Sequence, residues 1–154
     1  MPRESVTVGT RLTTQSRTIT ESDIVGFAGL SGDFHPAHTD EVYATRNELL
    51  KGRVAHGLLT LCISEGLFFR TNFFDWENEP LLSLGFNNVK FPNPVFPGDT
   101  ISSEFIVTEI RDSKSKPGMQ IVVMKCVCRK QDGEVVCEYE HPMIIASNAP
   151  PAKT

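Results

Sequence analysis

The order of apolar and polar positions predicts helices in the first half of the chain and strands in the second. Residues 6–18 alternate in the way typical of a half-exposed strand. Thr20 and Asp23 match a capping box, which predicts a helix running to about Leu30. From Leu81 onward the alternation favours four strands, at Leu81–Phe91, Thr100–Asp112, Ile121–Lys130 and Glu134–Ile145.

The segment from Ala55 to Phe69 is apolar on nearly every side, as expected of a helix in the middle of a domain. Asp132-Gly133 predicts an antiparallel hairpin between the last two strands. Pro97-Gly98-Asp99 predicts a second tight turn. We therefore expect an α+β fold in which a curved antiparallel sheet wraps one long helix. With no internal repeat or boundary, residues 1–154 are predicted to form one domain, with a frayed tail at 148–154.

Composition narrows the class of protein. A 40% hydrophobic and 22% charged chain of 154 residues is globular in character. The net charge of −4 and the scattered Lys and Arg residues argue against a nucleic-acid-binding surface. The first residues lack the apolar core of a signal peptide, and Leu58–Phe69 is short of a membrane span. A cytoplasmic protein that binds neither nucleic acid nor membrane is expected.

The four cysteines do not form the pattern of a disulfide framework. Cys62 falls in the apolar helix, and the other three fall in predicted strands. We expect four buried thiols. The spacing of Cys126 and Cys128 lacks the second half of a zinc motif, so it does not predict a metal site.

A stiff loop between the first two predicted helices carries titratable side chains. Gly32 and Pro36 break the helix around Asp33, and Thr39 is expected to cap a second short helix, which would put His38 at a helix N-terminus. Asp33 and His38 can together hold one water, the carboxylate accepting its proton while the imidazole orients it or supplies a proton to carbon. The alternative is structural: Asp33 closes an Asx turn and His38 only abuts the helix.

His56 and Gly57 begin the long helix, where unpaired N–H groups and the positive end of the dipole can polarise a carbonyl. A carbonyl at the Gly57 N–H would be stabilised as negative charge develops on it. The alternatives are an ordinary helix start for Gly57 and a structural hydrogen bond for His56.

Two further features allow more than one interpretation. Asp33, His35, His38 and His56 are chemically able to bind zinc, but Pro36 interrupts the helical face that the His35–His38 spacing would need, so no metal is expected. Glu65 lies inside the apolar helix, where a carboxylate must be paired, protonated or directed into a groove. We expect it to reach solvent or to line a contact between subunits.

Three ordered segments resemble one family, the MaoC-like dehydratases, which include (R)-specific enoyl-CoA hydratases. The first segment is Phe27–Asp40, which contains Ser31-Gly32-Asp33-Phe34-His35-Pro36-Ala37-His38. The others are Val54–Leu59 and Phe91–Asp99, so the resemblance spans almost the whole chain.

The resemblance implies a hot-dog fold and a hydro-lyase. By this likeness Asp33 and His38 hold the catalytic water, the Gly57 amide receives the thioester carbonyl, and His56 belongs to the substrate-binding region. Water would add to a trans-2-enoyl thioester of coenzyme A or of a carrier protein, giving the (R)-3-hydroxy product, or leave in the reverse direction. No cofactor is implied beyond coenzyme A as part of the substrate. The family also implies a homodimer with joined sheets and a place in fatty acid metabolism.

This chain departs from the family's common pattern at two positions: His35 stands where Asn is frequent, and Glu65 where a small residue is frequent. Glu65 suggests short or polar acyl groups. A hot-dog thioesterase and a non-catalytic acyl-thioester-binding subunit remain the alternative functions. Release of free thiol would identify the first, and binding without turnover beside a partner chain the second.

Overall fold

The computed structural model describes residues 6–75 and 79–146, so the predicted tail at 148–154 lies outside the described residues. Four helices and seven strands make up this part of the chain. In chain order they are β1 (Arg11–Thr13), β2 (Arg17–Thr18), α1 (Glu21–Ser31), α2 (Pro36–Thr39), α3 (Glu41–Arg46), α4 (Gly57–Phe69), β3 (Leu81–Ser83), β4 (Asn87–Lys90), β5 (Thr100–Asp112), β6 (Met119–Lys130) and β7 (Val135–Ala146).

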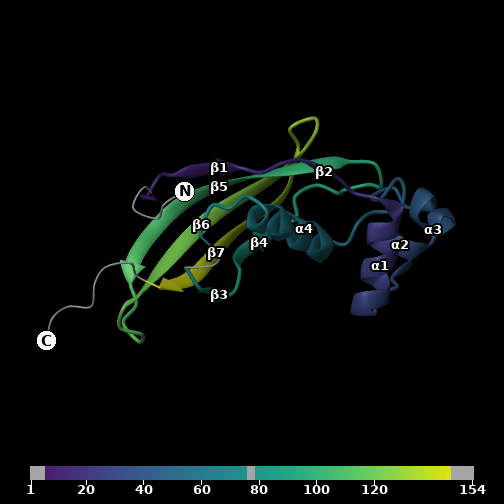
Figure 1. The fold of residues 1–154 in the computed structure, drawn as a ribbon. Helices are drawn as coiled ribbons and strands as arrows, with labels where there is room; N and C mark the ends of the chain where they lie inside the picture. Colours follow the sequence, from purple (N-terminus) through teal and green to yellow (C-terminus); the bar gives the residue numbers. More distant parts are fainter. Residues whose placement is uncertain (1–5, 76–78, 147–154) are drawn as a thin grey trace, which may run out of the picture.

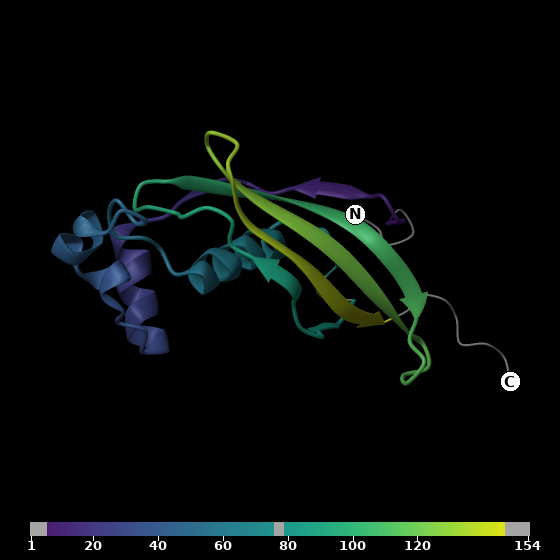
Figure 2. The ribbon, with the colours of Figure 1, turned by 180° about the vertical axis from the view of Figure 1, so that it is seen from behind.

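A single curved sheet holds all seven strands in the order β1-β5-β6-β7-β3, with β2 also pairing β5 and β4 also pairing β7. Every pairing is antiparallel. Both ribbon views show α4 lying along the concave side of this sheet, with α1, α2 and α3 gathered beyond one end of it (Figures 1 and 2). The prediction of a sheet wrapped around one long helix is therefore confirmed.

Helix starts and turns were predicted correctly where a short sequence motif determines them. The Thr20 hydroxyl accepts from the Asp23 N–H while the Asp23 carboxylate accepts from the Thr20 N–H, so the capping box is present. Gly133 and Gly98 both adopt positive φ, in the two predicted turns. The hairpin at Gly133 joins β6 to β7 as expected.

Two predicted strands are interrupted. Between β1 and β2, the Thr14 hydroxyl accepts from the Ser103 N–H, so a side chain takes one place in the backbone ladder. The predicted strand Leu81–Phe91 divides into β3 and β4, because Gly85 between them adopts positive φ, which an extended strand does not allow. Asn88 also adopts positive φ, and the pairing of β4 with β7 shifts register around it. The edge strands are consequently short.

The core lies between α4 and the inner faces of β5, β6 and β7. Ser64 of α4 is fully buried, and its hydroxyl lies 2.7 Å from Ser103 Oγ and 2.8 Å from the Tyr139 hydroxyl. Burial raises the pKa of Tyr139 and raises the pKa of Cys126 to about 12.

One side of α4 faces outward, contrary to the prediction of a helix buried all round. Leu58, Cys62 and Phe69 are exposed along it. The prediction of four buried thiols is thus wrong for Cys62 and confirmed for the three strand cysteines. The error arises because sequence hydrophobicity does not distinguish a core from an exposed apolar face.

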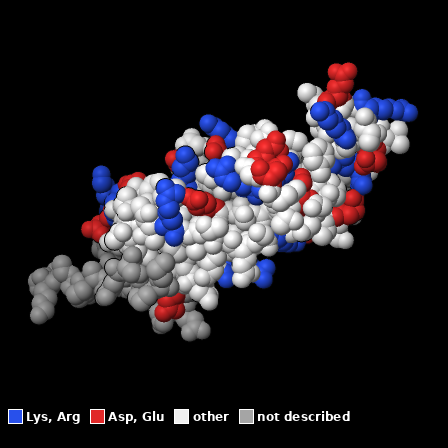
Figure 3. Space-filling view, turned by 90° about the horizontal axis from the view of Figure 1, so that it is seen from above, with Lys and Arg blue, Asp and Glu red and all other residues white. Residues whose placement is uncertain are grey.

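Positive and negative side chains are intermingled on the face of the sheet turned away from α4 (Figure 3). Several form ion pairs, including Arg111 with Glu109 at 2.7 Å. This face therefore lacks the one-sided basic field that nucleic acids require. In the described part of the chain, no helix is long and apolar enough to span a membrane.

Candidate active site

The loop after α1 is shaped by three residues in succession. Gly32 ends α1 with φ of 79°, the left-handed conformation that favours glycine. Pro36 then opens α2, and the His35 ring nitrogen Nδ1 caps this helix by accepting from the Ala37 N–H at 3.1 Å. The predicted capping role of Thr39 is wrong, because the turn begins earlier at Pro36 and Asp40 caps α3. His38 accordingly lies near the end of α2, not at a helix N-terminus.

Asp33 presents its two carboxylate oxygens to different partners. Oδ1 accepts from the His35 N–H at 3.1 Å, so the Asx turn considered as an alternative does form. Oδ2 faces His38 Nε2 at 3.9 Å. This separation exceeds a hydrogen bond but allows one water to contact both atoms. The structural and chemical interpretations of Asp33 are therefore compatible, since each uses a different oxygen.

Two hydrogen bonds cross between the Asp33 loop and the segment before α4. His38 Nδ1 lies 2.7 Å from the carbonyl oxygen of Val54, and His56 Nε2 lies 3.0 Å from the carbonyl oxygen of Asp33. A carbonyl only accepts, so each of these nitrogens carries its proton. The neutral His38 ring then has an unprotonated Nε2, which is the atom that faces Asp33.

His56 is a buried part of this arrangement. It is 3% exposed, its ring stacks on that of His38 with centroids 3.7 Å apart, and Phe27 packs on it at 4.9 Å. It therefore contacts the loop that carries Asp33 and His38, and its place in the substrate-binding region stays a prediction.

Asp33, His38 and His56 each bring one possible ligand atom within 4.8 Å of the others. The His38 and His56 rings, however, lie nearly parallel, at 23° to one another. The lone pair of a ring nitrogen lies in the ring plane, so those of stacked rings run side by side and do not converge on one ion. This orientation fits a water-binding pair better than a tetrahedral metal site.

Gly57 is the first residue of α4, and among the described residues no acceptor contacts its N–H. A pocket of about 210 Å³ opens beside it, lined by Val54, Ala55, Gly57, Thr60, Phe91, Pro92, Asn93, Pro94, Val95 and Val136. The Phe91 ring packs so closely on Gly57 that a Cβ there would lie 2.6 Å from its nearest carbon. Any larger residue at position 57 would displace the Phe91 ring or move the N–H at the start of α4.

Arg53 forms ion pairs with α1 and α3, the helices on either side of the loop. Arg53 contacts Glu21 of α1, and its Nε lies 2.7 Å from Glu41 of α3. The hydrogen bonds that Arg53 donates to Glu41 and then to Glu21 raise its pKa. Both carboxylates therefore hold the Arg53 side chain in contacts within the protein.

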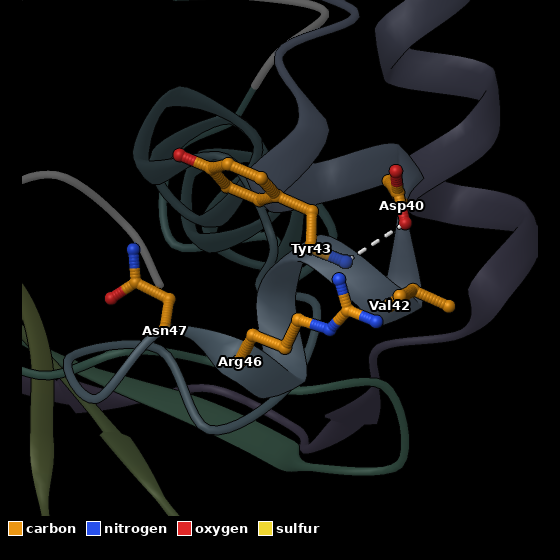
Figure 4. Close-up of a pocket in the computed structure, with 5 residues that line it drawn as sticks. All are labelled: Asp40, Val42, Tyr43, Arg46 and Asn47. Atoms are coloured by element: carbon orange, nitrogen blue, oxygen red, sulfur yellow. Dashed lines mark hydrogen bonds between the residues drawn. The ribbon is translucent and has the colours of Figure 1, made fainter.

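A separate hollow of about 360 Å³ lies on α3. Figure 4 shows its lining, where Asp40 accepts from the Tyr43 N–H and Arg46 extends beside them. The Tyr43 ring lies 6.0 Å from that of His35, so this hollow adjoins the loop from outside. Arg46 has no carboxylate partner in the part of the chain that the structure describes.

A second group of polar side chains was not predicted from sequence. Glu65 of α4 is 7% exposed, and its Oε2 lies 2.9 Å from Nδ1 of His141, which is 1% exposed. His141 Nε2 lies 2.8 Å from the Ser83 hydroxyl. The expectation that Glu65 reaches solvent is wrong, because the bend of the sheet brings β7 over this side of the helix.

Known sequences similar to this chain belong to one family. A family model described as a MaoC like domain matches residues 4–125. The (R)-specific enoyl-CoA hydratase of Rhodospirillum rubrum is 35% identical over 130 residues, covering 84% of this chain and 82% of that protein. The protein MaoC of Klebsiella aerogenes is 40% identical over 99 residues, which are 64% of this chain but only 28% of that longer protein.

Solved structures agree with this grouping. A MaoC-like dehydratase from Rhodospirillum rubrum superposes with a TM-score of 0.81 at 28% identity, covering 96% of this chain and 97% of that one. A protein from Archaeoglobus, described as a monoamine oxidase regulatory protein, gives 0.85 at 32% identity and 94% of each chain. The sheet wrapped around α4 is the hot-dog fold, and the chain belongs to the MaoC-like domain family.

Proposed function

We propose that this protein adds water to a trans-2-enoyl thioester, or removes it from an (R)-3-hydroxyacyl thioester, with Asp33 and His38 holding the water. The protein is a hydratase or dehydratase, and thus a hydro-lyase. The observation that carries the mechanism is the 3.9 Å gap between Asp33 Oδ2 and His38 Nε2, both of which can accept a proton.

In this mechanism one water donates one hydrogen bond to Asp33 and another to His38. These two bonds direct a lone pair of the water oxygen at the β-carbon. As the new carbon–oxygen bond forms, a water proton moves to Asp33 Oδ2. The alkene electrons move toward the thioester carbonyl, and a proton from the pair is then delivered to the α-carbon, so that the elements of water are added across the double bond. Because the carbonyl of Val54 fixes the proton on Nδ1, His38 is suited to orienting the water.

The thioester carbonyl would bind at the N–H of Gly57. This donor stands at the positive end of α4, beside the 210 Å³ pocket. A preorganised donor at such a carbonyl is worth about 2.7–4 kcal/mol when the enolate charge develops. No metal takes part in this scheme, because the pair itself activates the water.

The buried Glu65 and His141 pair is consistent with a short or polar acyl group, since it places polar atoms where α4 meets the sheet. Hydration rates across trans-2-enoyl-CoA substrates of different chain length test this proposal. A preference for long acyl chains would contradict it.

A homodimer is proposed because the outer side of α4 exposes Leu58 and Phe69 to water. A second copy would cover this surface, and joined sheets, the arrangement the family suggests, are compatible with it. Sedimentation should give twice the 17.1 kDa chain mass, and Phe69→Asp should lower it toward one chain. Monomeric wild-type protein at assay concentration would contradict the proposal. We also propose a cytoplasmic location and a place in fatty acid metabolism, which cell fractionation and substrate profiling would test.

The decisive experiment is hydration of crotonyl-CoA, followed by loss of enoyl thioester absorbance and chiral analysis of the alcohol. We expect the (R)-product, and a fall in rate of about 10²–10⁴-fold in Asp33→Asn and in His38→Ala. Asp40→Asn is a matched control, because Asp40 caps α3 and does not contact the pair. Free thiol without hydration would favour the thioesterase, and binding without turnover would favour the non-catalytic subunit.

A further inference from the structure

Two peptide groups connect His38 of the hydration site with Asp99, a carboxylate that the hydration scheme does not use. Asp99 Oδ2 accepts at 2.9 Å from the N–H of the Val95–Phe96 peptide group. The carbonyl of that group accepts at 2.7 Å from the N–H of the Val54–Ala55 peptide group. The carbonyl of the second group accepts at 2.7 Å from His38 Nδ1. Three hydrogen bonds therefore run in one direction, from the imidazole to the carboxylate.

The planarity of a peptide group couples the two ends of this hydrogen-bond chain. Both peptide groups are trans, so the carbonyl and the N–H of each point in opposite directions within one plane. The Val54 carbonyl cannot turn away from His38 without moving the N–H on the other side of the plane. That N–H is held by the carbonyl of Val95, so the position of Val95 decides how His38 is oriented.

The carboxylate strengthens the bonds between it and the imidazole. Hydrogen bonds in a row polarise one another, by about 10–30% per bond. Donation to Asp99 makes the Val95 carbonyl a better acceptor, and the same effect then reaches the Val54 carbonyl. The proton of His38 is thereby held on Nδ1, which leaves Nε2, the atom that faces Asp33, free to bind water.

The Asp99 side chain is fixed by its own surroundings. It is 15% exposed, Gln131 Nε2 donates to its Oδ1 at 2.9 Å, and Lys130 Nζ lies 3.7 Å from its Oδ2. Lys130 Nζ also lies 3.4 Å from the carbonyl oxygen of Pro94, the residue before Val95. These contacts keep the carboxylate turned toward the peptide group that it orients.

From this arrangement we propose that Asp99 is a positioning residue for hydration, which orients His38 through the two peptide groups. The inference rests on the proposed function, because His38 needs this orientation in order to hold the water. Asp99 does not line the pocket beside Gly57, so it should not contact the substrate. Its loss should therefore lower kcat and leave KM nearly unchanged.

The first measurement compares crotonyl-CoA hydration by wild-type protein, Asp99→Ala and Asp99→Asn. We expect Asp99→Ala to lower kcat by about 10–100-fold, because a small misplacement of a reacting group slows the reaction strongly. Asp99→Asn should lose less activity, since its amide oxygen can still accept from the Phe96 N–H. The matched control is Asp112→Ala, which removes an exposed carboxylate bonded to Gln120 at the other end of β5 and should leave kcat unchanged. A wild-type kcat in Asp99→Ala would overturn the proposal.

The second measurement reads His38 directly and needs no turnover. In protein labelled with ¹⁵N-histidine, the imidazole chemical shifts distinguish a proton on Nδ1 from a proton on Nε2. We expect the Nδ1 tautomer in wild type and in Asp112→Ala, and a mixture of both tautomers in Asp99→Ala. An unchanged tautomer in Asp99→Ala would overturn the proposal even if kcat falls, and so would the Nε2 tautomer in wild type. Inactive wild-type protein with the expected tautomers would refute the proposed hydration and retain the link between Asp99 and His38.

Asp99→Ala should fold, because the main-chain bonds of this turn do not depend on the side chain. The Asp99 N–H donates to the Phe96 carbonyl at 3.0 Å, and the Asp99 carbonyl accepts from the Ile19 N–H at 2.8 Å. Urea unfolding then shows whether kcat is measured on folded protein. If Asp99→Ala is unfolded, Asp99→Asn decides the question, and a wild-type kcat together with a wild-type tautomer in that variant would overturn the proposal.

Discussion

A methyl group at Gly57 would test how closely the start of α4 is packed. In Gly57→Ala the new Cβ would lie 2.6 Å from Cδ2 of Phe91 and 2.8 Å from two more ring carbons, where ordinary contacts begin at 3.4 Å. Overpacking of this kind costs about 1–3 kcal/mol. The Phe91 ring is 43% exposed and can partly yield, so we expect the lower half of that range. Alanine's better helix propensity offsets at most about 1 kcal/mol.

A double-mutant cycle isolates the clash. Urea unfolding at one fixed protein concentration would compare Gly57→Ala in the wild-type and Phe91→Ala backgrounds. The substitution should destabilise the first background and be neutral or stabilising in the second, with a coupling of about 1–2 kcal/mol. Crotonyl-CoA hydration should fall in Gly57→Ala because the displaced ring enters the adjoining pocket. An equal cost in both backgrounds would refute the reasoning.

Three other measurements address the supporting structure. His56→Phe keeps a ring against His38 but loses the bond to the Asp33 carbonyl, so we expect about 1 kcal/mol less stability and a lower kcat with little change in KM; an unchanged kcat would contradict this. With Ellman's reagent at pH 8 only Cys62 should react before unfolding, because burial raises the pKa of each of the three strand thiols; early loss of a second thiol would argue against the fold. Asp23→Ala should cost about 1 kcal/mol at pH 7. Although burial opposes it, bonding to Thr20 and Arg17 lowers the folded pKa of Asp23 below 3.8, so its contribution is full above that pH and is lost as the pH falls through the folded pKa. The loss of stability caused by Asp23→Ala, measured by urea unfolding, should therefore be smaller at pH 2–3 than at pH 7. The same loss at both pH values would contradict this.

The sequence predicted correctly those helix starts and turns that depend only on residues close together in the chain. The capping box at Thr20 and the turns at Gly98 and Gly133 each depend on a side chain or a backbone angle within four residues. The prediction failed at Thr39, because α2 already begins at Pro36 with His35 as its cap, and Asp40, not Thr39, caps α3.

The site could be predicted only in part for the same physical reason. Asp33 and His38 are five residues apart, so one loop positions both. Glu65 and His141 are 76 residues apart, and their contact depends on how the sheet bends over α4. No periodicity contains that information, which is why the buried pair and its contact with Ser83 emerged only from the fold.

The crossed hydrogen bonds between the two histidines and the main chain have a consequence for how the protein can vary. The acceptors at Asp33 and Val54 are main-chain carbonyls, so replacing either side chain does not remove them. The donors, by contrast, are side-chain imidazoles, so each bond is lost when its histidine is replaced. A lineage could therefore exchange the carboxylate and lose its chemistry while the loop stays in place, leaving a folded acyl-thioester binder one substitution away from an enzyme.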